Sequence, residues 1–362
     1  MINIKPKIYF ESLTTSRIKE HVKGRNILVV CSNSVWNLSS ISKVITSLQN
    51  QHKIKIFTHI SQNAPISEIQ KIIDECSGLT PETIIGVGGG SVIDACKALS
   101  VCFGQINIYD LFYGKAPLPS KKVSLIAIPT TAGTGAELSF GAILYDDINI
   151  VKGGIRGEVL QPDVVIIDVD LYKTAPNKIK AEVGFDSLTH AIETYLSNKA
   201  SALTRYQSIA AIKTIFNSLP DAVGGNINAL GKMAIASSMM GINLAYSSTC
   251  LPHRIQYIIG PLTNTSHAQG LIALYNGWIK LISENKRLSG LKNLESDMGK
   301  NFNLVDQIER LKEKLNLNHS ISSLGIKEDD WGFIADNVNG ALNSDPSYKD
   351  KNTIRYILKH SN

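Results

Sequence analysis

The sequence has few cysteines, no long apolar run and no dense cluster of charge of one sign. Its 362 residues include five cysteines, which are scattered and form no C-x-x-C pair. This usage argues against a disulfide framework and is typical of a reducing compartment. The opening segment MINIKPKIYF lacks the apolar core of a secretion signal, and no run of about 18 apolar residues could span a membrane. We therefore expect a cytoplasmic protein with no membrane partner.

The charge is mildly positive and evenly distributed. The net charge is +6, but no run of lysine or arginine is dense enough for a nucleic-acid groove, so we expect no nucleic-acid partner. Hydrophobic residues make up 43% of the chain and charged residues 19%, which predicts an ordered protein with a large core. The length suits about two domains.

Short apolar segments alternate with segments of helical periodicity between residues 26 and 171. The segments of strand length are NILVVCS, HKIKIFTHI, TIIGVGGG, VSLIAIPTT and DVVIIDVDL. Such alternation predicts a parallel, doubly wound sheet, which binds ligands at the carboxyl ends of its strands. The segment KIYFES, from residue 7, predicts an edge strand that could pair across a dimer.

The pattern changes near residue 177, after which only helical segments remain. We therefore predict an α/β fold in two parts. Residues 1–177 form a Rossmann-like nucleotide-binding domain with a parallel sheet, and residues 178–362 form an all-helical metal-binding domain. Because pockets prefer domain interfaces, we expect the metal to lie opposite the nucleotide.

The segment GVGGGSVIDACKAL places three glycines between a predicted strand and a predicted helix. Gly88, Gly89 and Gly90 lack Cβ atoms and allow the backbone to approach a phosphate. We interpret Ser91 as the helix N-cap, with Asp94 near the helix start. Free amides and the helix dipole there favour a pyrophosphate. Because serine at position 91 breaks the G-x-G-x-x-G pattern, a glycine turn without a ligand is the alternative.

A second loop, IPTTAGTGAE, follows the next predicted strand. Thr130, Thr131 and Thr134 offer hydroxyls that suit a ribose, an amide or a phosphate. An ordinary turn is the alternative. Lys152, further along the chain, could reach a cofactor or be solvated.

One carboxylate and three imidazoles could bind a single metal ion. Asp186 and His190 lie four residues apart in GFDSLTHAIETYL, a segment with helical periodicity, so both side chains lie on one helix face. His253 and His267 follow downstream. One oxygen and three nitrogen ligands suit Fe²⁺, Zn²⁺, Ni²⁺ or Mn²⁺. The alternative is a helix-terminal charge beside a core histidine.

Together these motifs resemble the iron-dependent (group III) alcohol dehydrogenase family. The resemblance is carried by GGGSVID at 88–94, PTTAGTGAE at 129–137, KGGIRGEVLQPDVVIIDVDL at 152–171, GFDSLTHAIETY at 184–195, and His253 and His267. It implies a divalent iron or zinc and NAD(P)-linked oxidation of alcohols or reduction of aldehydes. It also implies a homodimer whose small-molecule substrate is an alcohol or aldehyde.

The resemblance also assigns roles by position. The metal ligands become Asp186, His190, His253 and His267. The cofactor contacts become Gly88, Gly89, Gly90, Ser91, Asp94, Thr130, Thr131, Thr134 and Lys152.

The sequence departs from the family pattern at three positions. Tyr257 lies where many members have a histidine four residues after the third ligand, so it could replace that histidine in a proton relay or only shape the pocket. Ala268 follows the last ligand where many members have glycine. Ser32 ends the first strand of the alternating pattern where NAD-preferring members have an acidic residue, which makes NADP tolerable.

Two other functions compete with a dehydrogenase. One is lyase chemistry like that of dehydroquinate synthases, and the other is a non-catalytic metal-binding or nucleotide-binding protein. The variation at Tyr257 resembles family branches that act on polar aldehydes, including phosphonate-derived or sugar-derived ones. Arg156 and Arg254 could meet an acidic group of such a substrate, or could equally be surface or dimer residues.

Overall fold

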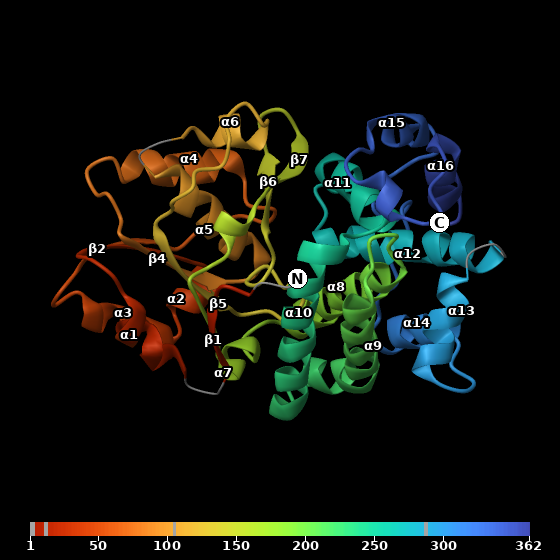
Figure 1. Ribbon diagram of the computed structural model, residues 1–362, viewed down its shortest axis with the longest axis horizontal. Helices are drawn as coiled ribbons and strands as arrows, with labels where there is room; N and C mark the ends of the chain where they lie inside the picture. Colours follow the sequence, from red (N-terminus) through yellow and green to blue (C-terminus); the bar gives the residue numbers. More distant parts are fainter. Residues whose placement is uncertain (1–3, 11–13, 104–105, 286–288) are drawn as a thin grey trace. The chain divides into compact units, whose positions relative to one another are not determined.

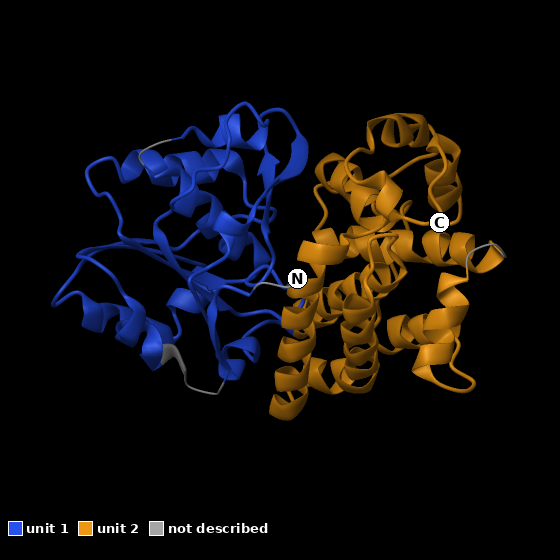
Figure 2. Ribbon diagram, in the orientation of Figure 1, with its two compact units in different colours: residues 1–176 blue, residues 177–362 orange. Residues whose placement is uncertain are grey.

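The chain folds into two compact units. The computed structural model describes residues 4–10, 14–103, 106–285 and 289–362. Residues 1–176 form the first unit and residues 177–362 the second (Figure 2).

The first unit contains the predicted parallel sheet (Figure 1). Its six strands lie in the order β1-β8-β5-β4-β2-β3, and all neighbouring pairs are parallel. The strands are β1 (Lys7–Phe10), β2 (Asn26–Cys31), β3 (Lys53–Phe57), β4 (Thr83–Gly88), β5 (Ser124–Pro129) and β8 (Val164–Ile167). The predicted strand KIYFES is found at one edge as β1, although its residues 11 and 12 lie outside the described residues.

Helices cover both faces of this sheet (Figure 1). Along β2, Leu28 and Val30 pack against one face, whereas Ile27 and Val29 pack against the other. Successive strand residues point to opposite faces, so a strand buried on both sides must be apolar throughout. The helices of this unit are α1 (Ile18–His21), α2 (Asn33–Trp36), α3 (Ser39–Leu48), α4 (Ile66–Glu75), α5 (Gly90–Cys102), α6 (Ile108–Phe112) and α7 (Val169–Tyr172), with short 3₁₀ turns at Thr14–Arg17 and Glu158–Leu160.

Two features of this unit differ from the sequence prediction. An antiparallel hairpin, β6 (Gly141–Asp146) and β7 (Val151–Arg156), was not predicted. The last predicted strand, DVVIIDVDL, is shorter in the structure than predicted. Strand β8 ends at Ile167, and α7 follows. Asp168 caps that helix by accepting a hydrogen bond from the amide of Asp170 at 3.2 Å.

The described elements of the second unit are helices. They are α8 (Asn177–Leu196), α9 (Ala202–Val223), α10 (Ile227–Ser247), α11 (Leu251–Thr263), α12 (His267–Glu284), α13 (Gly290–Met298), α14 (Leu304–Lys314), α15 (Asp330–Asn337) and α16 (Lys351–Lys359), with a 3₁₀ turn at Leu342–Ser344. Helix α8 is central: it packs against α9, α10 and α12, and nearly all its residues from Ala181 onward are buried. A helix that is buried on all sides can hold polar side chains away from water. None of the helices in the described ranges has the length and apolarity to span a membrane.

Candidate metal centre and nucleotide-binding turn

Three helices bring the four predicted metal ligands together. Asp186 and His190 lie on α8, four residues apart. His253 lies in the first turn of α11, and His267 is the first residue of α12. Their shared position follows from the spacing on α8 and from the packing of α12 against both α8 and α11.

A single oxygen of Asp186 is the meeting point of the three imidazoles. Asp186 Oδ1 lies 3.7 Å from Nε2 of His190, 3.6 Å from Nε2 of His253 and 4.0 Å from Nε2 of His267. Asp186, His253 and His267 each offer a ligand atom within 4.8 Å of the others. With metal–ligand bonds near 2.1 Å, neighbouring donors of a tetrahedral site lie about 3.4 Å apart. The observed distances are therefore close to those of a metal site and too long for hydrogen bonds.

The donor atoms themselves fit a divalent metal. Asp186 and His253 are each only 2% exposed, yet within the described residues Asp186 Oδ1 and His253 Nε2 lack hydrogen-bond partners. Burial alone would raise the pKa of Asp186, but the three imidazoles hold that pKa well below its usual range. Leaving such atoms unbonded costs about 1–3 kcal/mol each. A cation bound between them would remove this cost.

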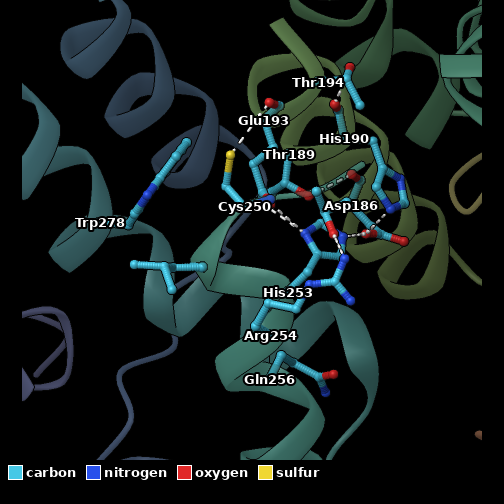
Figure 3. A network of polar contacts seen from close by, with 12 residues as sticks. Asp186, Thr189, His190, Glu193, Thr194, Cys250, His253, Arg254, Gln256 and Trp278 are labelled. Atoms are coloured by element: carbon cyan, nitrogen blue, oxygen red, sulfur yellow. Dashed lines mark hydrogen bonds and ion pairs between the residues drawn. The ribbon is translucent and has the colours of Figure 1, made fainter. Parts of the chain in front are cut away.

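Further side chains orient two of the imidazoles, and Figure 3 shows Glu193 beside His253. His253 Nδ1 lies 2.8 Å from Oε1 and 2.9 Å from Oε2 of Glu193. Burial opposes the charged form of His253, but Glu193 and Asp186 outweigh it and raise the pKa of His253 to about 9. His267 Nδ1 contacts Gln256 Oε1. Such partners set the imidazole tautomer and leave Nε2 facing the metal position.

A second carboxylate holds the start of α12 against α8. Ser266 caps α12 and forms a capping box with Gln269. Glu182, one turn before Asp186, accepts hydrogen bonds from Gln269 Nε2 at 3.1 Å and from Ser266 Oγ at 3.5 Å. Because His267 directly follows Ser266, these bonds fix the position of His267 relative to Asp186.

Tyr257 lies beside the last ligand. It is one turn after His253 on α11, and its ring centroid is 6.0 Å from that of His267, with 34° between the planes. The residue at this position is therefore part of the wall of the metal centre.

The predicted glycine turn lies at the switch point of the sheet. Strand β3 is added on one side of β2 and strand β4 on the other, so the strand order reverses between β2 and β4. Ligands bind at such positions in doubly wound sheets. Gly88 ends β4, Gly89 is the N-cap of α5, and Gly90 is its first residue. The interpretation of Ser91 as the N-cap was wrong. Gly89 takes that place and has no side chain to bond the first amides of α5, which leaves them for a ligand.

The glycine turn and the threonine loop pack directly against each other. A Cβ atom on Gly90 would lie 2.8 Å from the side chain of Thr134, and one on Gly89 would lie 3.2 Å from Thr131 Oγ1. Thr130, at the end of β5, donates its backbone amide to the carbonyl of Gly88 at 3.0 Å. The two predicted motifs therefore form one surface at the carboxyl ends of β4 and β5.

Three other predicted cofactor contacts, Ser91, Lys152 and Asp94, are bonded to groups of the protein. Ser91 Oγ accepts a hydrogen bond from the amide of Asn63 at 3.0 Å, and Lys152 Nζ on β7 donates to Asn63 Oδ1 at 2.7 Å. Asp94 Oδ2 accepts from the amide of Ile143 in the hairpin at 3.1 Å. Burial raises the pKa of Asp94 to about 6. At least one oxygen of Asp94 therefore has a structural role, because it bonds α5 to the hairpin.

Ser32 directly follows β2 and caps α2. Its Oγ accepts a hydrogen bond from the amide of Val35 at 3.4 Å and lies 3.0 Å from Ser34 Oγ. The end of β2 thus presents hydroxyls where a carboxylate would bind a ribose.

Sequence reasoning missed Glu193, Gln256 and Asn63. The first had a signal: it is seven residues after Asp186, on the same face of α8. Gln256 had a weaker one, since it lies three residues after His253. Asn63 is distant in sequence from the glycine turn, and no local pattern marks it.

Comparisons with known proteins identify the family. Residues 5–169 match the model of iron-containing alcohol dehydrogenases, and residues 180–362 match the C-terminal model of the Fe-containing alcohol dehydrogenase family. The chain therefore belongs to the iron-containing alcohol dehydrogenase family, which confirms the resemblance seen in the sequence.

Individual relatives differ in how much of them the chain covers. An aldehyde-alcohol dehydrogenase of Streptococcus pneumoniae is 30% identical over 278 residues, which are 73% of this chain and 32% of the relative. The chain thus spans about a third of that relative's length. Sulfoacetaldehyde reductase of Bilophila wadsworthia is 24% identical over 94% of this chain and 97% of its own. The solved structure of sulfoacetaldehyde reductase from Bifidobacterium kashiwanohense in complex with NAD⁺ has a TM-score of 0.89 at 22% identity, covering 99% of this chain and 97% of that one. This structural match confirms the predicted fold.

Proposed function

We propose that the chain is an iron-dependent, NAD-linked alcohol dehydrogenase that interconverts a small alcohol and its aldehyde. The observation that carries this proposal is the convergence of three imidazole Nε2 atoms on Asp186 Oδ1. Family membership supports it, as do relatives named for reactions of alcohols and aldehydes.

The proposed iron ligands are Asp186, His190, His253 and His267. When bound, a divalent metal supplies Lewis-acid polarisation of the substrate oxygen. The chain's own share is orientation: Glu193 holds the ring of His253 and Gln256 holds the ring of His267. One oxygen and three nitrogen donors also suit zinc, so the metal in the native protein must be measured.

The nucleotide is proposed to bind at the surface formed by the glycine turn and the threonine loop. The amides at the start of α5 would bond the pyrophosphate, and the hydroxyls of Thr131 and Thr134 lie against the same turn. Lys152, held by Asn63, adds a positive charge. Because Ser32 carries no charge that would repel a 2′-phosphate, we propose that NADP is also accepted. A strong preference for NADH in compared Michaelis constants would contradict this part.

Tyr257 is the proposed proton donor. Aldehyde reduction consumes a hydride from the nicotinamide and a proton. Tyr257 Oη can move a proton, and its ring lies beside His267. The alternative role for Tyr257, shaping the pocket, needs no hydroxyl.

A homodimer in the cytoplasm completes the proposal. Strand β1 lies at a sheet edge, and the nearby Ile4 and Ile8 are 42% and 40% exposed. An exposed edge strand is a template for pairing with a second copy. Light scattering of the purified chain would measure the oligomeric state, and a monomer would contradict this part.

The direct test of the proposed activity is net nucleotide turnover. Protein purified anaerobically and loaded with Fe²⁺ should oxidise NADH or NADPH in proportion to added aldehyde. Binding of the nucleotide without net oxidation, on any aldehyde of a panel, would contradict the proposal and favour synthase-like or non-catalytic chemistry.

A further inference from the structure

Arg254 is a buried cation next to the metal centre, and no carboxylate among the described residues forms an ion pair with it. It follows His253 on α11 and is only 9% exposed. Its Nη2 donates to the hydroxyls of Ser248 and Thr249, each at 3.1 Å. Within the described residues its Nε lacks a hydrogen-bond partner, and none of the ion pairs includes it. Burying a charge without an ionic partner is costly.

Two carboxylates at the start of α11, Glu193 and Asp345, are bonded to other groups. Glu193 accepts bonds from His253 and from the amide of Cys250. Asp345 accepts from the amide of Leu251, from Trp278 Nε1, and from the amide and hydroxyl of Ser347. These carboxylates satisfy the first amides of α11 and the neighbouring core. Within the described residues, neither carboxylate forms an ion pair with Arg254.

Arg254 lies near the proposed proton donor, Tyr257, and through it near the proposed metal ligands. Its Cζ lies 5.7 Å from the ring centroid of Tyr257, and that ring lies 6.0 Å from the ring of His267. Tyr257 therefore lies near both the guanidinium and a proposed iron ligand. These two distances together limit the separation between the Arg254 guanidinium and the His267 ring, so a short molecule suffices to contact both Arg254 and the metal position.

We propose that Arg254, with Ser248 and Thr249, is an anion-binding subsite, and that the substrate is a short aldehyde carrying a carboxylate, sulfonate or phosphonate group. This inference rests on the proposed dehydrogenase function and names its substrate class. A guanidinium forms paired, charge-assisted hydrogen bonds to planar carboxylates and to tetrahedral oxyanions. The two hydroxyls hold the guanidinium by Nη2, and its Nε has no hydrogen-bond partner within the described residues.

The test compares aldehydes of one shape and different charge. Sulfoacetaldehyde carries a sulfonate group where the neutral 3,3-dimethylbutanal carries a tert-butyl group of similar shape. A third aldehyde, 3-oxopropanoate, carries a carboxylate at the same position. Arg254→Met keeps the length of the side chain and removes the charge, whereas Arg254→Lys restores the charge. Arg205→Met is the matched control, because Arg205 also lies 5.7 Å from a tyrosine ring, that of Tyr195, but is exposed.

The expected result is a loss that is much larger for the charged substrates. Arg254→Met should lower kcat/KM roughly 10- to 100-fold for at least one anionic aldehyde, mainly through KM. Its kcat/KM for the neutral 3,3-dimethylbutanal should fall much less, and Arg254→Lys should recover part of the loss on the anionic aldehyde. The larger of the two losses identifies the head group. An equal loss on neutral and anionic aldehydes would show a structural role for Arg254 and overturn the proposal.

A binding measurement separates this inference from the proposed function. The alcohol 2-hydroxyethanesulfonate should raise the Tm of the wild type, by binding the folded state, and should not raise the Tm of Arg254→Met. The neutral 3,3-dimethylbutan-1-ol should lack this Arg254-dependent effect. If no aldehyde is turned over, the dehydrogenase proposal fails, but this shift still decides for or against the anion subsite. If neutral aldehydes are turned over and no such shift occurs, only the subsite fails.

Discussion

Asp186 Oδ1 lies 3.6 Å from His253 Nε2, and no hydrogen bond joins these two buried atoms. A buried carboxylate and imidazole that served only the fold would be expected to close this gap, because an unmade buried bond is costly. His253 instead has its other ring nitrogen bonded to Glu193, at 2.8 and 2.9 Å from the two carboxylate oxygens. The gap is therefore maintained by the surrounding structure, as a metal position requires.

Glu193 is predicted to support iron binding without contacting the iron. Glu193→Gln removes the negative charge that orients the ring of His253. This charge also strengthens the Nε2 lone pair of His253 as a metal ligand. We expect iron affinity to fall roughly 10- to 100-fold, as for other carboxylates that support a metal-ligating histidine. Titration with Fe²⁺ under anaerobic conditions measures this. The exposed Glu328 provides the control, Glu328→Gln, and equal affinities in both variants would refute the role of Glu193.

The glycine turn is predicted to tolerate no side chain at position 90. In Gly90→Ala the new Cβ would press against Thr134 at 2.8 Å, which separates the turn from the threonine loop. We expect the KM for NADH to rise roughly 10- to 100-fold, because small displacements at such sites have large effects. Gly78→Ala is the control, since its Cβ would meet nothing within 4 Å. An unchanged KM for NADH in Gly90→Ala would place the nucleotide elsewhere.

Tyr257→Phe separates the two roles considered for Tyr257. If the hydroxyl supplies the proton, kcat for aldehyde reduction should fall at least about tenfold, while iron content stays unchanged. Phenylalanine keeps the ring beside His267, so a role in pocket shape alone predicts wild-type kcat. Steady-state kinetics with a saturating aldehyde decide between them, and Tyr206→Phe, on an exposed tyrosine, is the control.

Because Lys312 is buried, we expect the free energy of unfolding to rise with pH in the alkaline range. Lys312 is 6% exposed and donates to the carbonyl of Ile272 at 3.2 Å and to Asn276 Oδ1 at 2.8 Å. Burial lowers the pKa of Lys312 to about 8, whereas an unfolded lysine titrates near 10.4. Between these values the unfolded chain binds more protons, so the free energy of unfolding rises with pH, by up to about 3 kcal/mol.

Urea denaturation of the wild type and of Lys312→Met measures this contribution. From about pH 8 to about pH 10, the wild type should gain stability relative to the variant. Below about pH 8 the difference should be constant, because lysine is then charged in both states. Parallel stability curves across the alkaline range would contradict the assignment.

Much of the fold could be predicted from short-range patterns. Strands buried on both faces, such as β2 and β4, must be apolar throughout, and the glycines after β4 mark the turn into α5. The hairpin could not be predicted in this way. Its second strand, VKGGIR, alternates poorly and contains two glycines, and its pairing with β6 and packing near α6 come from tertiary contacts.

The candidate site was predictable in part for the same reason. Asp186 and His190 share a helix face, so their spacing alone indicates a common ligand. Helix α11, in contrast, contains Pro252 and Pro261, and proline in a sequence argues against a helix. Pro252 lies in the first turn, where the missing amide costs little. The lack of an ion pair at Arg254 among the described residues is a property of tertiary packing, and no sequence spacing indicates it.

Iron content is the measurement that tests the central claim most directly. The wild type, His267→Ala and the control His59→Ala, on an exposed histidine, should be purified anaerobically without chelator, loaded with Fe²⁺ and desalted. We predict about one iron per chain in the wild type and the control, with very little in His267→Ala and a parallel loss of turnover. Full iron and full activity in His267→Ala would show that Asp186, His190, His253 and His267 do not form the metal site.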